Sequence, residues 1–156
     1  MILSRCHRAV PRRQAGVGLI EVLVALLVLS IGLLGVAALL ATSLSTNNSA
    51  MSRSMAVVSS YSILDAMRAD STNAKAGQYN TTVKANACPT GQGTLAATQL
   101  ATWCSQLGTY FGQTANTQGI INCTTLGICQ VQVVFDDSRA GTGGANNQTV
   151  TTQAQL

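Results

Sequence analysis

The chain has 156 residues, of which 47% are hydrophobic and only 9% are charged, whereas charged residues make up about 25% of a typical soluble protein. The net charge of +4 comes from residues 1–16, which hold four arginines and no acid, while the rest of the chain balances five basic against five acidic residues. This distribution argues against a nucleic-acid-binding surface and favours a membrane-topology signal followed by one small globular domain.

A membrane-spanning helix is predicted directly after the basic segment. The run from Val22 to Ala41 contains no charged residue, and its 20 residues form a helix of about 30 Å, the thickness of a bilayer's hydrocarbon core. Glu21 is the single acid of an apolar stretch that begins at Val17, and a carboxylate near hydrocarbon requires a partner and a function. A removed secretory signal, cut near Ala38 or Ala41, fits less well because its apolar core is normally shorter.

The same helix is expected to continue beyond the membrane, because residues 42–70 contain neither proline nor glycine. We therefore predict one helix from Val17 to Ala69, with a surface ion pair between Asp65 and Arg68. Apolar residues recur in its second half at helical spacing and predict a stripe that the rest of the domain covers. The stripe consists of Leu44, Met51, Met55, Val58, Tyr61 (or Ser62) and Leu64.

Residues 71–156 predict a small domain, which gives an α+β fold with the long helix packed on a small antiparallel sheet. We expect loops over 71–94 and 136–147, a helix over 95–107 that ends at Gly108, and a turn over 124–127. The predicted strands are a short one near Tyr79–Val83, two at Ile120–Cys123 and Ile128–Phe135, and an edge strand at Thr149–Leu156.

Four cysteines in this part of the chain predict two disulfides and hence an oxidising compartment, which in a bacterium is the periplasm or the cell surface. They are Cys88, Cys104, Cys123 and Cys129. We favour Cys88–Cys104 with Cys123–Cys129, because the second pair flanks a predicted hairpin, although the crossed pairings remain open. Zinc binding is disfavoured, since there is no Cys-x-x-Cys and no histidine after the leader. A calcium loop at residues 136–138 is disfavoured because no third acid follows.

The N-terminal sequence Gly-Val-Gly-Leu-Ile-Glu, residues 16–21, resembles the class III signal and first helix of type IV pilins and pseudopilins. Together with the later Leu-Ser-Ile-Gly-Leu-Leu-Gly, residues 29–35, it is most similar to minor pilins of the PilV type. The resemblance implies that prepilin peptidase removes residues 1–16 by cutting between Gly16 and Val17, and that Val17 becomes N-methylated. The family usually has Phe where this chain has Val17 and Thr where it has Gly18.

The resemblance also implies a pilin-like architecture of four parts: leader (1–16), transmembrane half-helix (17–41), periplasmic half-helix (42–70) and disulfide-containing domain (71–156). Glu21 would pair with the N-terminal amine of a neighbouring subunit and set the axial register, a use of a buried ion pair that gives specificity rather than stability. Gly32 and Gly35 would loosen the helix on assembly, with close helix packing as the alternative.

The implied function is that of a minor pilin which primes assembly of the type IV pilus and thereby supports twitching motility and adhesion. Expected partners are other pilins, prepilin peptidase, the inner-membrane assembly platform and, before assembly, membrane lipid. The N-terminus would be cytoplasmic and the domain periplasmic, then part of the pilus surface. Alternatives are a minor pseudopilin of a type II secretion system and a membrane-anchored adhesin. We expect no enzymatic activity, cofactor, metal or direct nucleic-acid binding, because the sequence offers no nucleophile–base pair, phosphate loop or paired carboxylates.

Overall fold

The computed structural model of the protein describes residues 16–156, so that the predicted leader, apart from Gly16, lies outside the described residues. The chain divides between Leu40 and Ala41 into two units. In chain order the elements are α1 (Leu19–Ala69), α2 (Ser71–Lys75), β1 (Thr81–Lys84), α3 (Leu95–Phe111), β2 (Gln118–Cys123), β3 (Ile128–Phe135), the 3-10 helix η1 (Ser138–Gly143) and β4 (Gln148–Gln155).

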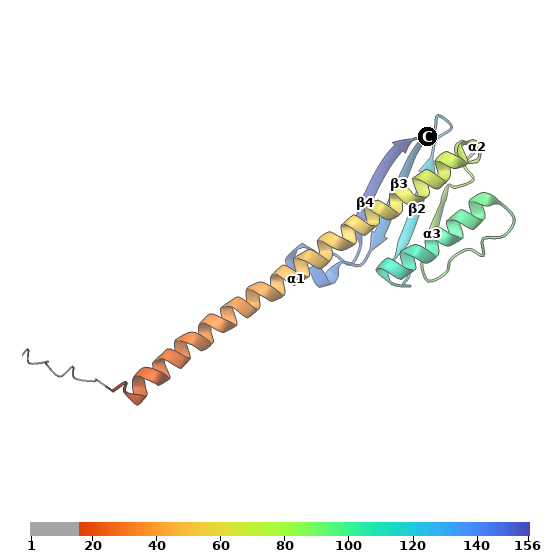
Figure 1. Ribbon diagram of the computed structural model, residues 1–156. Coiled ribbons are helices and arrows are strands. Elements are labelled where there is room, and N and C mark those ends of the chain that lie inside the picture. The colour runs from red at the N-terminus through yellow and green to blue at the C-terminus, as the bar shows by residue number, and fades with distance from the viewer. Residues whose placement is uncertain (1–15) are drawn as a thin grey trace, which may run out of the picture. The chain divides into compact units, whose positions relative to one another are not determined.

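The four strands form one antiparallel sheet in the order β1-β2-β3-β4, and the second half of α1 lies with α3 against one of its faces (Figure 1). The side chains of β3 alternate between buried and partly exposed, as the sequence predicts. The buried ones face the helices and are Cys129, Val131, Val133 and Phe135. The α+β class and the packing of the long helix on a small antiparallel sheet are therefore confirmed.

The face of α1 that packs on the sheet shares Leu64 with the predicted stripe, but the prediction is wrong for Leu44, Met51, Val58 and Tyr61. Leu44, Met51 and Val58 are 61–70% exposed, and Tyr61 is half exposed. The buried face combines four small residues, Ser or Ala, with three large apolar ones. Its members are Ser49, Ala56, Ser59, Ser60, Ile63, Leu64 and Met67.

Helix α3 extends four residues past the predicted range and carries the largest buried side chain, Trp103. Gly108 does not end this helix but is buried within it. The helix ends before Gly112, whose φ of 94° is readily adopted only by glycine. The indole N–H of Trp103 donates to the carbonyl oxygen of Ser59 at 2.9 Å, and its ring lies against Gly119 of β2. Trp103 thus joins α3 to both α1 and the sheet.

Two segments predicted as loops contain short helices, α2 and η1, which a single turn of sequence does not reveal. The first strand begins at Thr81 rather than near Tyr79, whose buried phenol O–H donates to Asp70. Burial and the Asp70 carboxylate both raise the pKa of the Tyr79 phenol. The β2–β3 turn needs Gly127, which has φ 82°.

Two disulfides close loops within the domain, in the pairing that the sequence favoured. Cys88 is bonded to Cys104 and ties the segment after β1 to α3. Cys123 is bonded to Cys129 across the β2–β3 hairpin, where the two residues lie directly opposite each other. In the chain-entropy treatment, bridges that close loops of these lengths contribute about 2–3 kcal/mol each.

Candidate functional site

The N-terminal end of α1 holds the residues that the sequence singles out for processing and assembly. Gly16, Val17 and Gly18 precede the helix, which begins at Leu19. The backbone N–H groups of Glu21 and Val22 both donate to the carbonyl oxygen of Gly18, at 3.0 and 3.3 Å. Glu21 therefore occupies the first turn with an exposed side chain, where the positive end of the helix dipole stabilises a carboxylate.

The first half of α1 exposes apolar side chains on every side. Each residue from Gly16 to Leu40 is exposed, and the helix is long and apolar enough to cross a membrane, by its length and composition. It is the one such helix in residues 16–156. A Cβ added at Gly32 or Gly35 would meet nothing within 4 Å, so that packing within one chain does not require glycine there. The expected role of these two glycines, loosening of the helix on assembly, stays a prediction.

The comparison with known families decides what kind of segment this is. Residues 11–37 match the prokaryotic N-terminal methylation motif. This methylation motif supports a type IV pilin-like or pseudopilin precursor, a structural subunit that associates with a pilus-type assembly machinery, and it fits membrane anchoring by the apolar helix. The match ends before the compact domain, and its first five residues lie outside the described residues. No curated protein and no solved structure gives a significant match.

The compact domain carries a second apolar feature, which we call the outward stripe and define as Leu44, Met51, Val58 and Tyr61. The first three are spaced by seven residues, so that they lie along one side of the helix. This side is roughly opposite the face that contains Ala56 and Ile63, because those residues are about half a turn of the helix away. The outward stripe is therefore directed away from the sheet, and in residues 16–156 nothing covers it.

A polar cluster fixes α1 to the segment that follows β3. Asp137 is 6% exposed and accepts a hydrogen bond from the Ser49 hydroxyl at 2.5 Å, while its backbone N–H donates to Ala145. The guanidinium of Arg53 lies 3.9 Å from the same carboxylate, and the hydroxyl of Ser45 donates to the carbonyl oxygen of Arg139. We expected a loop over residues 136–147, and the structure adds that Asp137 anchors the start of this segment to α1.

Asp136, the neighbour of Asp137, is fully exposed and serves only the turn. Its carboxylate accepts from the backbone N–H of Ser138 at 2.9 Å, and this hydrogen bond lowers the pKa of Asp136. No group of three or more potential metal ligands occurs within residues 16–156. The acidic pair thus has a structural explanation in the fold.

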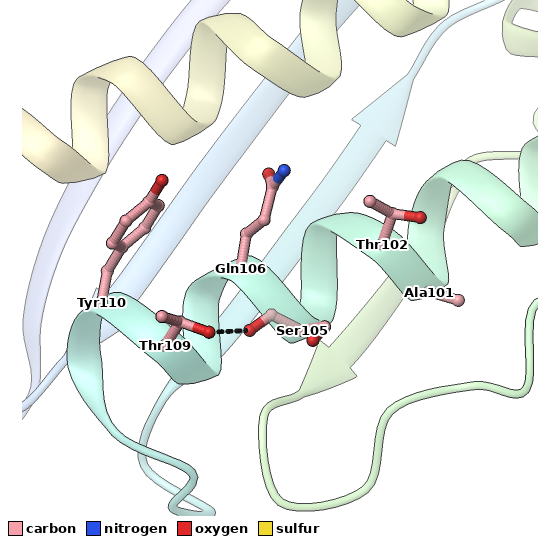
Figure 2. Close-up of a pocket in the computed structure, with 6 residues that line it drawn as sticks. All are labelled: Ala101, Thr102, Ser105, Gln106, Thr109 and Tyr110. Carbon is pink, nitrogen blue, oxygen red and sulfur yellow. Dashed lines mark hydrogen bonds between the residues drawn. The ribbon is translucent and has the colours of Figure 1, made fainter.

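A groove runs along α3, with a volume of about 450 Å³. Figure 2 shows Thr102, Gln106 and Tyr110 rising from α3 on the side of α1. The hydroxyl groups of Thr102 and Thr109 donate to backbone carbonyl oxygens of their own helix, at 3.0 Å each. The residues that line this groove are uncharged, and none pairs a nucleophile with a base. The lining residues therefore indicate a shallow surface along α3 and no catalytic arrangement.

Two features of the candidate sites were missed from the sequence. The small residues of the buried helix face escaped notice because Ser and Ala carry little weight in an apolar periodicity. The polar cluster joins Ser49 to Asp137, which lie 88 positions apart, and no local pattern indicates such a contact. The residues of the outward stripe were identified from the sequence, but we expected the rest of the domain to cover them.

Proposed function

We propose that the protein is a minor pilin of the PilV type, which is processed by prepilin peptidase and helps to prime assembly of the type IV pilus. The observation that carries the proposal is the methylation motif, which leads directly into a helix with apolar side chains on every side. Such a helix is suited to lipid before assembly and to packing among similar helices in the assembled pilus.

The outward stripe supports assembly as well. Its seven-residue spacing is the spacing at which one helix packs lengthwise against another. Each large side chain buried there would gain about 1.5–3 kcal/mol relative to exposure. Because this stripe lies opposite the side that meets the sheet, the helix can pack against neighbouring subunits without losing its contacts within the domain.

Processing would cut the bond between Gly16 and Val17 and leave a new amine about one helical turn from Glu21. In a filament the Glu21 carboxylate would pair with the N-methylated Val17 amine of a neighbour, and this pair would fix the axial register. Pairing with the amine of the same chain, or with water at the membrane edge, is the alternative. Gly32 and Gly35 would let this part of the helix loosen when the subunit leaves the membrane.

Three measurements test the proposal in the native host. Mass spectrometry of the mature protein should find N-methylated Val17 at the N-terminus, and Gly16→Leu should leave the leader attached. Glu21→Ala should abolish incorporation into pili, whereas the control Asp65→Ala, which removes an exposed acid of the same helix, should not. If Glu21→Ala is incorporated normally, the register role is wrong.

Deletion of the protein distinguishes a role in the type IV pilus from a role in type II secretion. The proposal expects loss of surface pili and of twitching motility with intact type II secretion. The reverse outcome would assign the protein to the type II secretion system as a minor pseudopilin. Normal pili and normal secretion would favour a membrane-anchored adhesin.

A further inference from the structure

The outer edge of β4 presents free backbone hydrogen-bonding groups. Leu156 donates its backbone N–H to the carbonyl oxygen of Gly127, directly opposite, at 2.8 Å. In an antiparallel ladder, hydrogen-bonded pairs alternate with non-bonded ones, so the register of β3 with β4 makes every second residue from Leu156 a bonded partner of β3. The residues between them direct N–H and C=O away from β3. They are Thr149, Thr151, Gln153 and Gln155.

This edge lacks the usual protection against pairing with another strand. β4 is eight residues long and contains neither a charged residue nor proline, and in residues 16–156 no strand or helix pairs with its outer side. The other edge, β1, is only four residues long, carries Lys84, and ends in a tight turn in which the Ala87 N–H donates to the Lys84 carbonyl oxygen. Proteins normally shorten, charge or cover their edge strands, and here only one of the two edges is treated so.

On the side of the sheet that carries α1, the flank of the helix beside β4 is partly exposed. The Arg53 guanidinium lies 3.5 Å from the Gln148 side chain, which places this flank of α1 over the start of β4. Val57 follows one turn later on the same flank and is 38% exposed. A strand added beside β4 would direct alternate side chains toward this flank. An uncharged segment with an apolar side chain opposite Val57 would bury both.

A second copy of the chain does not fit this edge well. Antiparallel pairing of two β4 strands would relate the copies by a two-fold axis normal to the sheet. The two Ala41 residues, where each domain joins its apolar segment, would then lie at opposite ends of the joint sheet. The second halves of the two α1 helices would then run in opposite directions, which does not suit two copies that enter one membrane in the same orientation.

We propose that the outer edge of β4 binds an extended, uncharged segment of a different protein, which becomes a fifth strand of the sheet. Backbone hydrogen bonds to the four outward residues provide the affinity, and packing against the partly exposed side chain of Val57 provides the selectivity. The inference holds whether the subunit serves a pilus or a secretion system, and it holds for an unprocessed chain as well, because the edge belongs entirely to the compact domain.

The test uses the full-length protein in its native membrane, with the photo-crosslinking amino acid benzoylphenylalanine at Gln153. The matched control carries the same group at Thr82 on the protected edge β1. Thr151→Pro removes one outward N–H and leaves the β3 ladder intact, whereas Thr151→Val keeps that N–H. Formation of both disulfides and the melting temperature establish that each variant is folded. If Thr151→Pro fails this check, the double variant Thr149→Lys and Thr151→Lys replaces it, because edge lysines block pairing without altering the ladder.

We expect position 153 to crosslink to one extended segment of another protein, identified by mass spectrometry of the linked peptides, and position 82 to give no such product. The yield should fall about tenfold or more in the blocked variant, because the added strand loses a hydrogen bond and meets the proline ring, and it should be unchanged in Thr151→Val. Absence of a crosslink from position 153, a crosslink to a second copy of the chain, or a yield that the blocked variant leaves unchanged would each overturn the proposal.

Discussion

The contact between Trp103 and Gly119 allows a sharp test of how the domain is packed. A Cβ added at Gly119 would fall within contact distance of the distal atoms of the indole ring, and it would lie 2.8 Å from Cδ1 of Leu107. Gly119 is itself buried in the middle of the sheet, between β1 and β3. The substitution Gly119→Ala therefore forces the indole to move, and α3 moves with it.

The expected magnitudes follow from these contacts. Overpacking of this kind costs about 1–3 kcal/mol, which is partly offset by the gain of about 0.5–1 kcal/mol for replacing glycine within a strand. Trp103→Phe loses the hydrogen bond to Ser59, worth about 1 kcal/mol, and leaves a cavity that costs about 1–2 kcal/mol more. Phenylalanine is shorter, so it removes the atoms that the new Cβ would meet. The double variant should then be more stable than the sum of the two single losses predicts, by about 1–2 kcal/mol.

The assay is urea unfolding of residues 41–156, which contain both disulfides and every buried residue of residues 16–156. Circular dichroism would follow unfolding of the wild type, the two single variants and the double variant in urea. Thermal unfolding of the same four proteins should shift the melting temperature by about 3–5 °C for each kcal/mol. Tyr110→Phe, which changes a half-exposed aromatic residue of the same helix, should change stability by less than about 0.5 kcal/mol. Additive losses in the double variant would refute the inference that Gly119 is glycine because of Trp103.

Three further outcomes follow from the polar contacts of the domain. Asp137→Ala should lower the unfolding free energy by about 2–3 kcal/mol, because the Ser49 hydroxyl loses its buried acceptor; urea unfolding would measure this, and a loss below about 0.5 kcal/mol would contradict it. The pKa of Asp136 is lowered in the folded state, so its contribution is present above the unfolded value near 3.9 and is lost as pH falls. Asp136→Asn should therefore make the melting temperature less sensitive to pH below about 4. The pKa of Tyr79 is raised, so its contribution is complete below the unfolded value near 10 and is lost at higher pH. An absorbance titration of the phenolate, compared between the wild type and Tyr79→Phe, would measure this. The part of the signal that belongs to Tyr79 should appear only well above pH 10.

Most of the architecture could be predicted from local patterns. The period-two alternation of β3 identified the strand and its buried face, because one side of a sheet is buried and the other is not. The apolar run after Gly16 placed the start of α1 to within two residues, and the lack of proline and glycine in residues 42–70 predicted its continuation to Ala69. The interaction of Asp65 with Arg68 was also predicted, since the residues lie one turn apart, and it is present at 2.6 Å.

The buried face of α1 could not be predicted in the same way. Large apolar side chains normally mark the side of a helix that meets the core, and here they lie on both sides of α1. Between Ser49 and Ser60 the buried side holds only Ser and Ala, which a search for large apolar side chains overlooks. In such a case apolar periodicity marks the exposed side of the helix as well as the side where the domain packs.

The polar and aromatic anchors on α1 have a mechanical consequence. Sliding of the helix along its axis is resisted by its large buried side chains and also by polar contacts. Ser45, Ser49 and Arg53 bind the segment after β3, and Trp103 of α3 donates to the carbonyl oxygen of Ser59. A pulling force along the helix would therefore be shared between the segment after β3, α3 and the chain connection that follows α1.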